Sequence, residues 1–234
     1  MSNTEDPQER PQDINQIING LERYNPEAVG PLENYLQQQC EQRFCDGNSN
    51  RVLLKLYQLN PDRIKDEVIT NILVKAMTAF PSPQFNLALH LLAPSSLAPG
   101  TELSEAVTKL RALNAHLQGA SFGRFWSTLD SDDLYADLTT DIDGFEDTIR
   151  LHIAQIVSEA FREVQVDILE GWLGLEGKDA VQKYVVDTCG WKVEGDVVLI
   201  PKNADNEAKK AEIREDVNVD MFARIIRRSW EEVA

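Results

Sequence analysis

The sequence predicts a mainly α-helical protein, with a helical-repeat domain followed by a winged-helix domain that carries a small β-hairpin. Three observations predict this fold. Apolar residues recur at helical spacing along most of the chain, an Asn-Pro pair returns after 35 residues, and two short β-rich runs flank a turn near residue 195. At 234 residues and 42% hydrophobic composition, the chain is long enough to bury a core.

Residues 1–12 are charged and contain two prolines, so they are expected to form a disordered tail. The apolar spacing from Ile14 to Leu21 then predicts a helix that stops at the first Asn-Pro pair. Asn25 is expected to cap the next helix, with Pro26 in its first turn. That helix carries an apolar stripe from Val29 to Cys40, and the turn-forming residues 46–50 are expected to close it.

The second Asn-Pro pair predicts a helical repeat. Asn60-Pro61 follows Asn25-Pro26 after 35 residues, and each pair comes after an apolar helical run. A period of this length with two helices per unit is typical of HEAT- or TPR-like stacks. Further stripes predict helices over 64–76, 85–92, 103–117 and 122–129, with Gly119 ending the third and Ser121 capping the fourth. The predicted helical-repeat domain covers residues 13–143.

An acidic segment marks the expected boundary between the two domains. Residues 130–147 contain eight acidic and no basic side chains. A calcium loop does not fit, because Thr139 falls at the first ligand position and Arg150 at the last, which requires Glu. A catalytic carboxylate pair has no neighbouring histidine or aromatic pocket to separate its pKa values. The favoured interpretation is a solvated acidic face on a linker.

Residues 144–202 predict the winged helix. Apolar stripes predict helices over 145–160, 166–173 and 180–185, and Gly190 is expected to end the third in a left-handed conformation. The runs 191–193 and 197–200 predict a hairpin around Gly195, stopped by Pro201. Residues 203–234 are expected to form a charged linker and a C-terminal helix with one apolar stripe.

Charge and composition exclude several classes of partner. The formal net charge of −16 opposes binding to nucleic acid or an anionic membrane, which both favour clustered Lys and Arg. No apolar run approaches the length of a membrane span, and the polar start does not resemble a signal peptide. Three cysteines and no Asn-x-Ser/Thr sequence predict reduced thiols in the cytosol or nucleus.

Candidate catalytic residues do not form a recognisable site, so we expect no catalytic, cofactor-binding or metal-binding residues. The three histidines are isolated, and the glycine run at 171–177 lacks the preceding strand of a dinucleotide fingerprint. The third predicted helix of the winged helix has almost no net charge, which argues against DNA binding. Contact with other proteins, for instance through the hairpin edge, is favoured. The enzyme alternative would use His116, His152 and the acids of 130–147.

Five short strings carry a resemblance to a known family: Arg23 to Glu27, Leu53 to Pro61, Phe125-Trp126, Gly144 to Asp147 and Cys189 to Trp191. They resemble, in order over about residues 20–200, the family of k subunits of eukaryotic translation initiation factor 3, which are PCI-domain proteins. The resemblance implies the PCI arrangement of helical repeat and winged helix. It also implies a non-catalytic, cytoplasmic scaffold that binds no cofactor and acts in translation initiation on the small ribosomal subunit.

The same resemblance implies the partners. These are the other subunits of the factor, chiefly subunit l, and through the complex the small ribosomal subunit, with no direct contact to DNA or membrane. Family winged helices associate side by side and last helices join a shared bundle. The implied partner-binding residues are therefore Val197, Val198, Leu199, Ile200, Phe222, Ile225, Ile226 and Trp230.

Two alternatives stay open at this point. The chain could belong to another PCI assembly, such as the proteasome lid or the signalosome, and the last stripe could pack on its own chain. The sequence also departs from the family pattern after Pro201, where the segment from Lys202 to Asp216 and three arginines of the last helix look extended.

Overall fold

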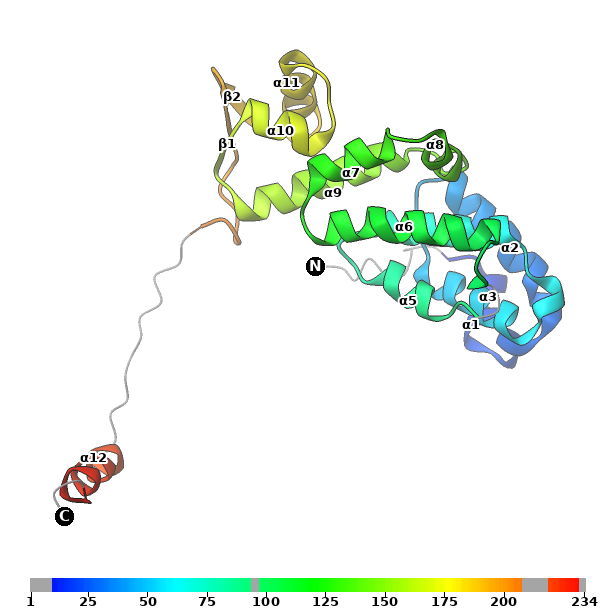
Figure 1. Ribbon diagram of the computed structural model, residues 1–234, viewed down its shortest axis with the longest axis horizontal. Helices are drawn as coiled ribbons and strands as arrows, with labels where there is room; N and C mark the ends of the chain where they lie inside the picture. Colours follow the sequence, from blue (N-terminus) through cyan, green and yellow to red (C-terminus); the bar gives the residue numbers. More distant parts are fainter. Residues whose placement is uncertain (1–9, 94–96, 208–218, 232–234) are drawn as a thin grey trace.

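The computed structural model describes residues 10–93, 97–207 and 219–231 and confirms a mainly α-helical fold with a small sheet (Figure 1). The helices are α1 (Gln12–Asn19), α2 (Val29–Glu41), α3 (Gly47–Leu59), α4 (Asp66–Met77), α5 (Gln84–His90), α6 (Glu102–Gln118), α7 (Phe122–Leu129), α8 (Asp133–Thr140), α9 (Phe145–Ala160), α10 (Val166–Leu173), α11 (Lys178–Asp187) and α12 (Val219–Glu231). Short 3-10 helices are η1 (Leu21–Tyr24), η2 (Pro26–Ala28) and η3 (Pro61–Arg63), and the strands are β1 (Glu163–Gln165), β2 (Lys192–Glu194) and β3 (Val197–Leu199).

The N-terminal helices stack as pairs. Helix α2 packs on α3, α4 on α5 and α6 on α7, while α2 contacts α4, α4 contacts α6 and α3 contacts α5. Both Asn-Pro pairs precede the first helix of a pair: Asn25 caps η2 before α2, and Pro61 opens η3 before α4. This is the stacked arrangement that the helical repeat predicts.

The beginnings of α1 and α3 differ from the prediction. Residues 46–50 do not close α2 but begin α3, because the buried Asp46 side chain caps that helix by accepting the Asn48 and Ser49 N–H groups, each at 3.1 Å. Residues 10–12 are ordered, although they fall in the expected tail. Arg10 donates to both Asp46 carboxylate oxygens, at 2.6 and 2.8 Å, and α1 begins at Gln12.

Further along the chain, glycines end helices as expected, but Ser121 does not act as a cap. Gly119 is the C-cap of α6, and Gly190 has a positive φ of 67° after α11. Ser121 stands at the N-cap position of α7, yet its hydroxyl makes no capping hydrogen bond there. Its hydroxyl instead donates to the Gly119 carbonyl, at 3.4 Å.

The winged helix contains one strand more than the sequence predicted. Strand β1 pairs antiparallel with β3, as β2 does, so the sheet order is β1-β3-β2. The edge of the predicted two-stranded hairpin is therefore open only on the β2 side. The backbone of β3 is paired on both sides, and the side chains of Val198 and Ile200 are buried in the core. The two edges of this sheet belong to β1 and β2.

The acidic segment 130–147 is folded rather than a linker. Helix α8 occupies its middle and packs on α4, and Tyr135 and Ile142 are buried. The apolar core is continuous from α1 through the winged helix, including Ile149, Leu169 and Val185. The domain division at residues 143 and 144 stays a proposal.

Trp126 of α7 joins the helical stack to the winged helix. Its Nε1 donates to the Trp172 carbonyl at 2.8 Å, and the Arg150 guanidinium lies 4.8 Å from its ring centroid. Gly174 ends α10 at φ 58°, and a Cβ built there would lie 2.5 Å from the Trp126 ring. Only glycine satisfies both the backbone conformation and the close approach. The packing therefore fixes the winged helix against α7.

Candidate protein interaction site

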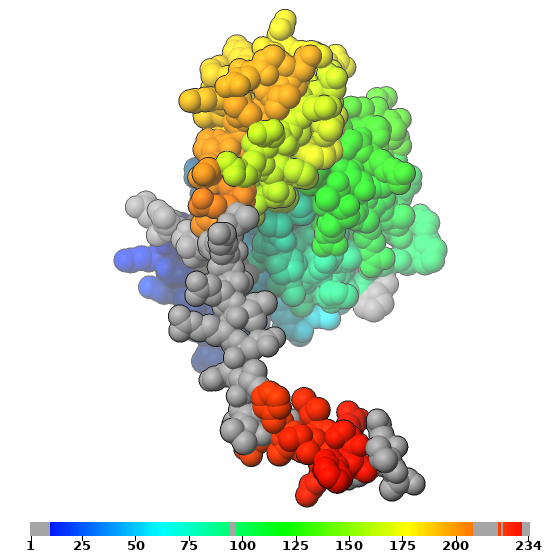
Figure 2. All heavy atoms as spheres, turned by 90° about the vertical axis from the view of Figure 1, so that its left-hand side faces the viewer, coloured from blue at the N-terminus to red at the C-terminus, as the bar shows by residue number. Residues whose placement is uncertain are grey.

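Helix α12 presents an exposed apolar stripe. The side chains of Phe222, Ile225, Ile226 and Trp230 are 54% to 76% exposed. Their spacing of three, four and eight positions from Phe222 places them on one helix face. In both views α12 lies away from the rest of the molecule (Figures 1 and 2). The alternative that this stripe packs on its own chain is therefore not what the structure shows.

The opposite face of α12 is basic. At about 100° per residue, Arg224, Arg227 and Arg228 fall on the side away from the stripe, and all three are exposed. An amphipathic helix with an uncovered apolar face is a typical protein-binding element. The sequence predicted this stripe and its residues.

The predicted partner-binding residues of the winged helix differ in exposure. The side chains of Val198 and Ile200 are buried, while those of Val197 and Leu199 are half-buried. Because β3 lies in the middle of the sheet, the free backbone groups are on the outer edges of β1 and β2. Sequence reasoning missed β1 and its edge, although the polar-apolar-polar alternation in Glu163–Gln165 is a weak strand signal.

The start of the expected charged linker is anchored to α9. Asn203 Nδ2 donates to the Ser158 carbonyl at 2.7 Å, and Asn206 Nδ2 donates to the same carbonyl at 2.9 Å. These bonds satisfy an acceptor in the last turn of α9. The rest of the linker predicted up to Asp216 lies outside the described residues.

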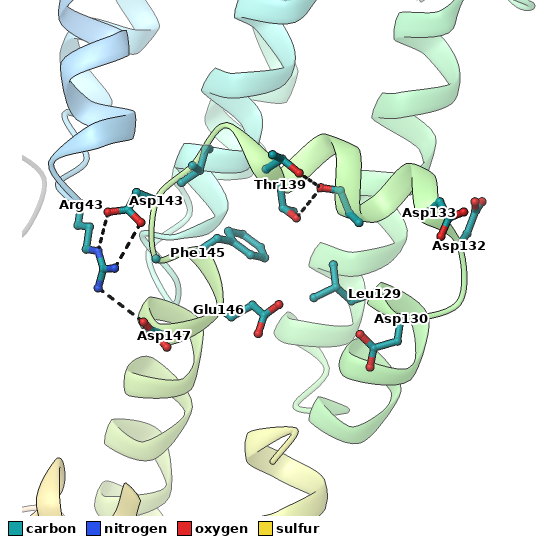
Figure 3. A pocket seen from close by; sticks show the side chains of 14 residues that line it. Arg43, Leu129, Asp130, Asp132, Asp133, Thr139, Asp143, Phe145, Glu146 and Asp147 are labelled. Carbon is teal, nitrogen blue, oxygen red and sulfur yellow. Dashed lines mark hydrogen bonds and ion pairs between the residues drawn. The ribbon is translucent and has the colours of Figure 1, made fainter. Parts of the chain in front are cut away.

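Six of the eight acids of 130–147 line an open cleft of about 680 Å³ (Figure 3): Asp130, Asp132, Asp133, Asp143, Glu146 and Asp147. Arg43 crosses one side of it, with its Nε 3.2 Å from an Asp143 carboxylate oxygen and its Nη1 3.6 Å from Asp147. The Arg43 guanidinium holds the pKa of Asp143 below its usual range, and Lys109 does the same for the pKa of Asp132. These carboxylates are therefore charged and partly neutralised by neighbouring cations.

The cleft does not assemble the groups of the enzyme alternative. Neither His116 nor His152 lines it. Within the described ranges, no group of three or more His, Cys, Asp and Glu side chains is placed to hold a metal ion. The three cysteines are free thiols, and burial raises the pKa of Cys45 to about 12, which keeps that thiol protonated. No helix in the described part of the chain is both long and apolar enough to cross a membrane.

Comparison with known proteins identifies relatives along the whole chain. A family model described as the CSN8/PSMD8/EIF3K family matches residues 63–212. A protein of Neurospora crassa named eukaryotic translation initiation factor 3 subunit K is 73% identical over 236 residues, covering 99% of this chain and 100% of its own. Proteins of the same name from Pyricularia oryzae and Botryotinia fuckeliana are 70% and 49% identical, covering 100% and 97% of this chain and 99% and 96% of their own. The chain therefore belongs to the CSN8/PSMD8/EIF3K family, among the members named eukaryotic translation initiation factor 3 subunit K.

Proposed function

We propose that the chain is a non-catalytic scaffold and interaction subunit of eukaryotic translation initiation factor 3, acting in the cytoplasm during initiation on the small ribosomal subunit. The observation that carries this proposal is the identity of 73% to a subunit K over 99% of the chain. The family name also covers proteins of two other kinds, but the full-length relatives share the initiation-factor name.

The fold supports an assembly role in physical terms. A continuous core and the Trp126 contact hold the two halves in one rigid arrangement, while α12 leaves four large apolar side chains uncovered. Burying one such side chain contributes about 1.5 to 3 kcal/mol, so the stripe can supply much of the free energy of a stable contact. The exposed apolar stripe of α12 can therefore bind a neighbouring polypeptide.

We assign subunit l as the chief partner. In this proposal α12 packs its apolar stripe in a helical bundle with that subunit, and the two winged helices lie side by side. Val197 and Leu199 reach the interface from β3, whereas Val198 and Ile200 support the sheet from inside the core. The free edge of β2 is available to a neighbouring strand.

A binding titration with recombinant subunit l tests this assignment. We expect Trp230→Ala to weaken the affinity about tenfold or more, because a buried aromatic anchor carries a large share of interface energy. Leu21→Ser is the matched control, since Leu21 is 89% exposed but lies on η1, far along the chain from α12. Absence of binding by the unaltered chain, or an equal loss in both variants, would reject the assignment.

A further inference from the structure

We propose that a pocket between α1, η1 and α3 binds a short acidic segment of a partner protein. This basic pocket has a volume of about 470 Å³, and its charged lining residues are Arg23, Arg51 and Lys55. Such a volume lies within the usual range of ligand pockets, about 300 to 1,000 Å³. The inference does not depend on which assembly the chain joins.

The charge of the basic pocket is opposite to that of the whole molecule. The chain has a formal net charge of −16, yet no acidic side chain lines this pocket. Most cations elsewhere in the helical stack are paired with carboxylates, as Arg10, Arg43, Arg63, Lys65 and Lys109 show. A local excess of positive charge is therefore held in a hollow of an acidic protein.

The three cations of the pocket make only neutral contacts in the described part of the chain. Arg51 donates to the side-chain oxygens of Asn48 and Gln84, and Lys55 Nζ donates to Gln58 Oε1 at 2.7 Å. The Arg23 guanidinium lies over the Tyr24 ring, 5.4 Å from its centroid. Because none of these partners carries a negative charge, each cation is available to a carboxylate.

The three cationic side chains lie around an apolar base of the pocket. Arg51 and Lys55 are four residues apart on α3, which places them on one face about 5 to 6 Å apart at Cβ. Arg23 comes from η1, which packs against α3. Ile18 and Val52 are buried at the floor, and the Tyr24 ring is exposed. The pocket thus matches two or three carboxylates around one apolar side chain.

An acidic peptide fits this charge distribution better than a nucleic acid does. Affinity for a nucleic-acid strand grows with the number of phosphates that a protein neutralises, and a strand extends beyond three cations. Outside the pocket it would meet a chain whose acidic side chains outnumber the basic ones by 39 to 23. A short peptide keeps its carboxylates inside the pocket. There, each arginine guanidinium can bind one carboxylate through two hydrogen bonds.

Fluorescence anisotropy with a labelled peptide, Gly-Glu-Asp-Leu-Asp-Glu-Gly, tests the proposal on the full chain. We expect saturable binding that weakens about tenfold or more in Arg23→Gln/Lys55→Gln, whose two side chains are exposed and bear no core contact. The matched control is Lys183→Gln/Lys192→Gln, which removes the same charge from exposed positions of the winged helix and should leave the affinity unchanged.

A second peptide, with every Glu and Asp replaced by Gln and Asn, keeps the test independent of protein folding. The proposal predicts that it does not bind. Equal binding of both peptides, no binding of the acidic one, or equal losses in the two double variants would overturn the proposal. Tighter binding of a ten-nucleotide oligouridylate through Arg23 and Lys55 would overturn it in favour of a nucleic-acid site.

Discussion

At the scale of single residues, Asp46 joins three parts of the chain. Its carboxylate is fully buried, accepts two hydrogen bonds from Arg10, and caps α3. The Tyr35 hydroxyl donates to it at 3.3 Å, and burial next to this carboxylate raises the pKa of Tyr35 to about 12. The N-terminal segment is therefore held to α2 and α3 by one charged group.

We expect Asp46→Asn to lower the free energy of unfolding by about 3 to 5 kcal/mol, because a buried ion pair loses one of its two charges. Urea denaturation followed by circular dichroism measures the change. Asp143→Asn is the control, since Asp143 pairs with Arg43 on the surface and solvent screens that pair. Similar shifts in the two variants would contradict the role given to Asp46.

His152 makes the stability depend on pH. Burial lowers its pKa from the usual 6.5, so below that value the unfolded chain binds a proton that the folded chain does not. The stability contribution is present above the unfolded pKa and is lost as the pH falls through the folded pKa. We expect the urea midpoint to fall between about pH 7.5 and about pH 5.5, and to fall less in His152→Gln. The same pH dependence in both proteins would contradict this assignment.

At the scale of elements, the contact between α10 and α7 depends on Gly174. Gly174→Ala combines a left-handed backbone with a Cβ 2.5 Å from the Trp126 ring, so we expect thermal unfolding to shift strongly. Gly190→Ala is the matched control, because Gly190 has φ 67° and open space around its Cβ. The control should lose about 1 to 2 kcal/mol and Gly174→Ala about 3 kcal/mol or more. Equal losses would show that Trp126 does not fix the winged helix.

Two C-terminal truncations are expected to differ in stability, because only one of them keeps the hydrogen bonds to the end of α9. A chain ending at Glu207 keeps Asn203 and Asn206 on the Ser158 carbonyl and should unfold at the same temperature as the full chain. A chain ending at Pro201 loses these bonds and should be less stable by about 1 to 3 kcal/mol. Differential scanning calorimetry compares the two. A large loss of stability in the chain that ends at Glu207 would mean that α12 stabilises the rest of the protein.

The elements that follow a repeating pattern were predictable. Helical stripes such as the one from Leu103 to Leu117 reflect burial on one face, and Gly195 marks the hairpin turn through its positive φ. Strand β1 has three residues and pairs with a strand more than thirty residues later, so its local pattern is too short to identify it. Residues 46–50 were misread because residues that form turns also cap helices.

At the scale of the whole molecule, tertiary packing decided what the sequence alone did not show. Arg51 and Lys55 lie one turn apart on α3, and Arg23 joins them only because η1 packs on α3. The apolar stripe of α12 was visible in the sequence, but only its exposure indicates that it is free for a partner. In the described part of the chain, the protein is therefore an acidic body with a basic pocket between α1, η1 and α3, and its helix α12 is uncovered.

We expect a change in assembly rather than in folding when α12 is altered. Phe222→Ser/Trp230→Ser should leave the thermal unfolding of the isolated chain unchanged, because both side chains are exposed. The same variant should exchange faster out of the assembled factor, since apolar contacts across an interface mainly set the dissociation rate. Pulse-chase exchange of the tagged chain measures that rate, and a loss of folding instead would contradict the prediction.

The fold and the relatives indicate that the chain works as a subunit of translation initiation factor 3. Cross-linked co-purification of the tagged full chain at its native level, with the recovered proteins quantified by mass spectrometry, tests it most directly. We expect the other subunits of the factor, subunit l foremost, to be recovered in near-equal amounts. Recovery of proteasome-lid or signalosome subunits in their place, or of no initiation-factor subunit at all, would contradict it.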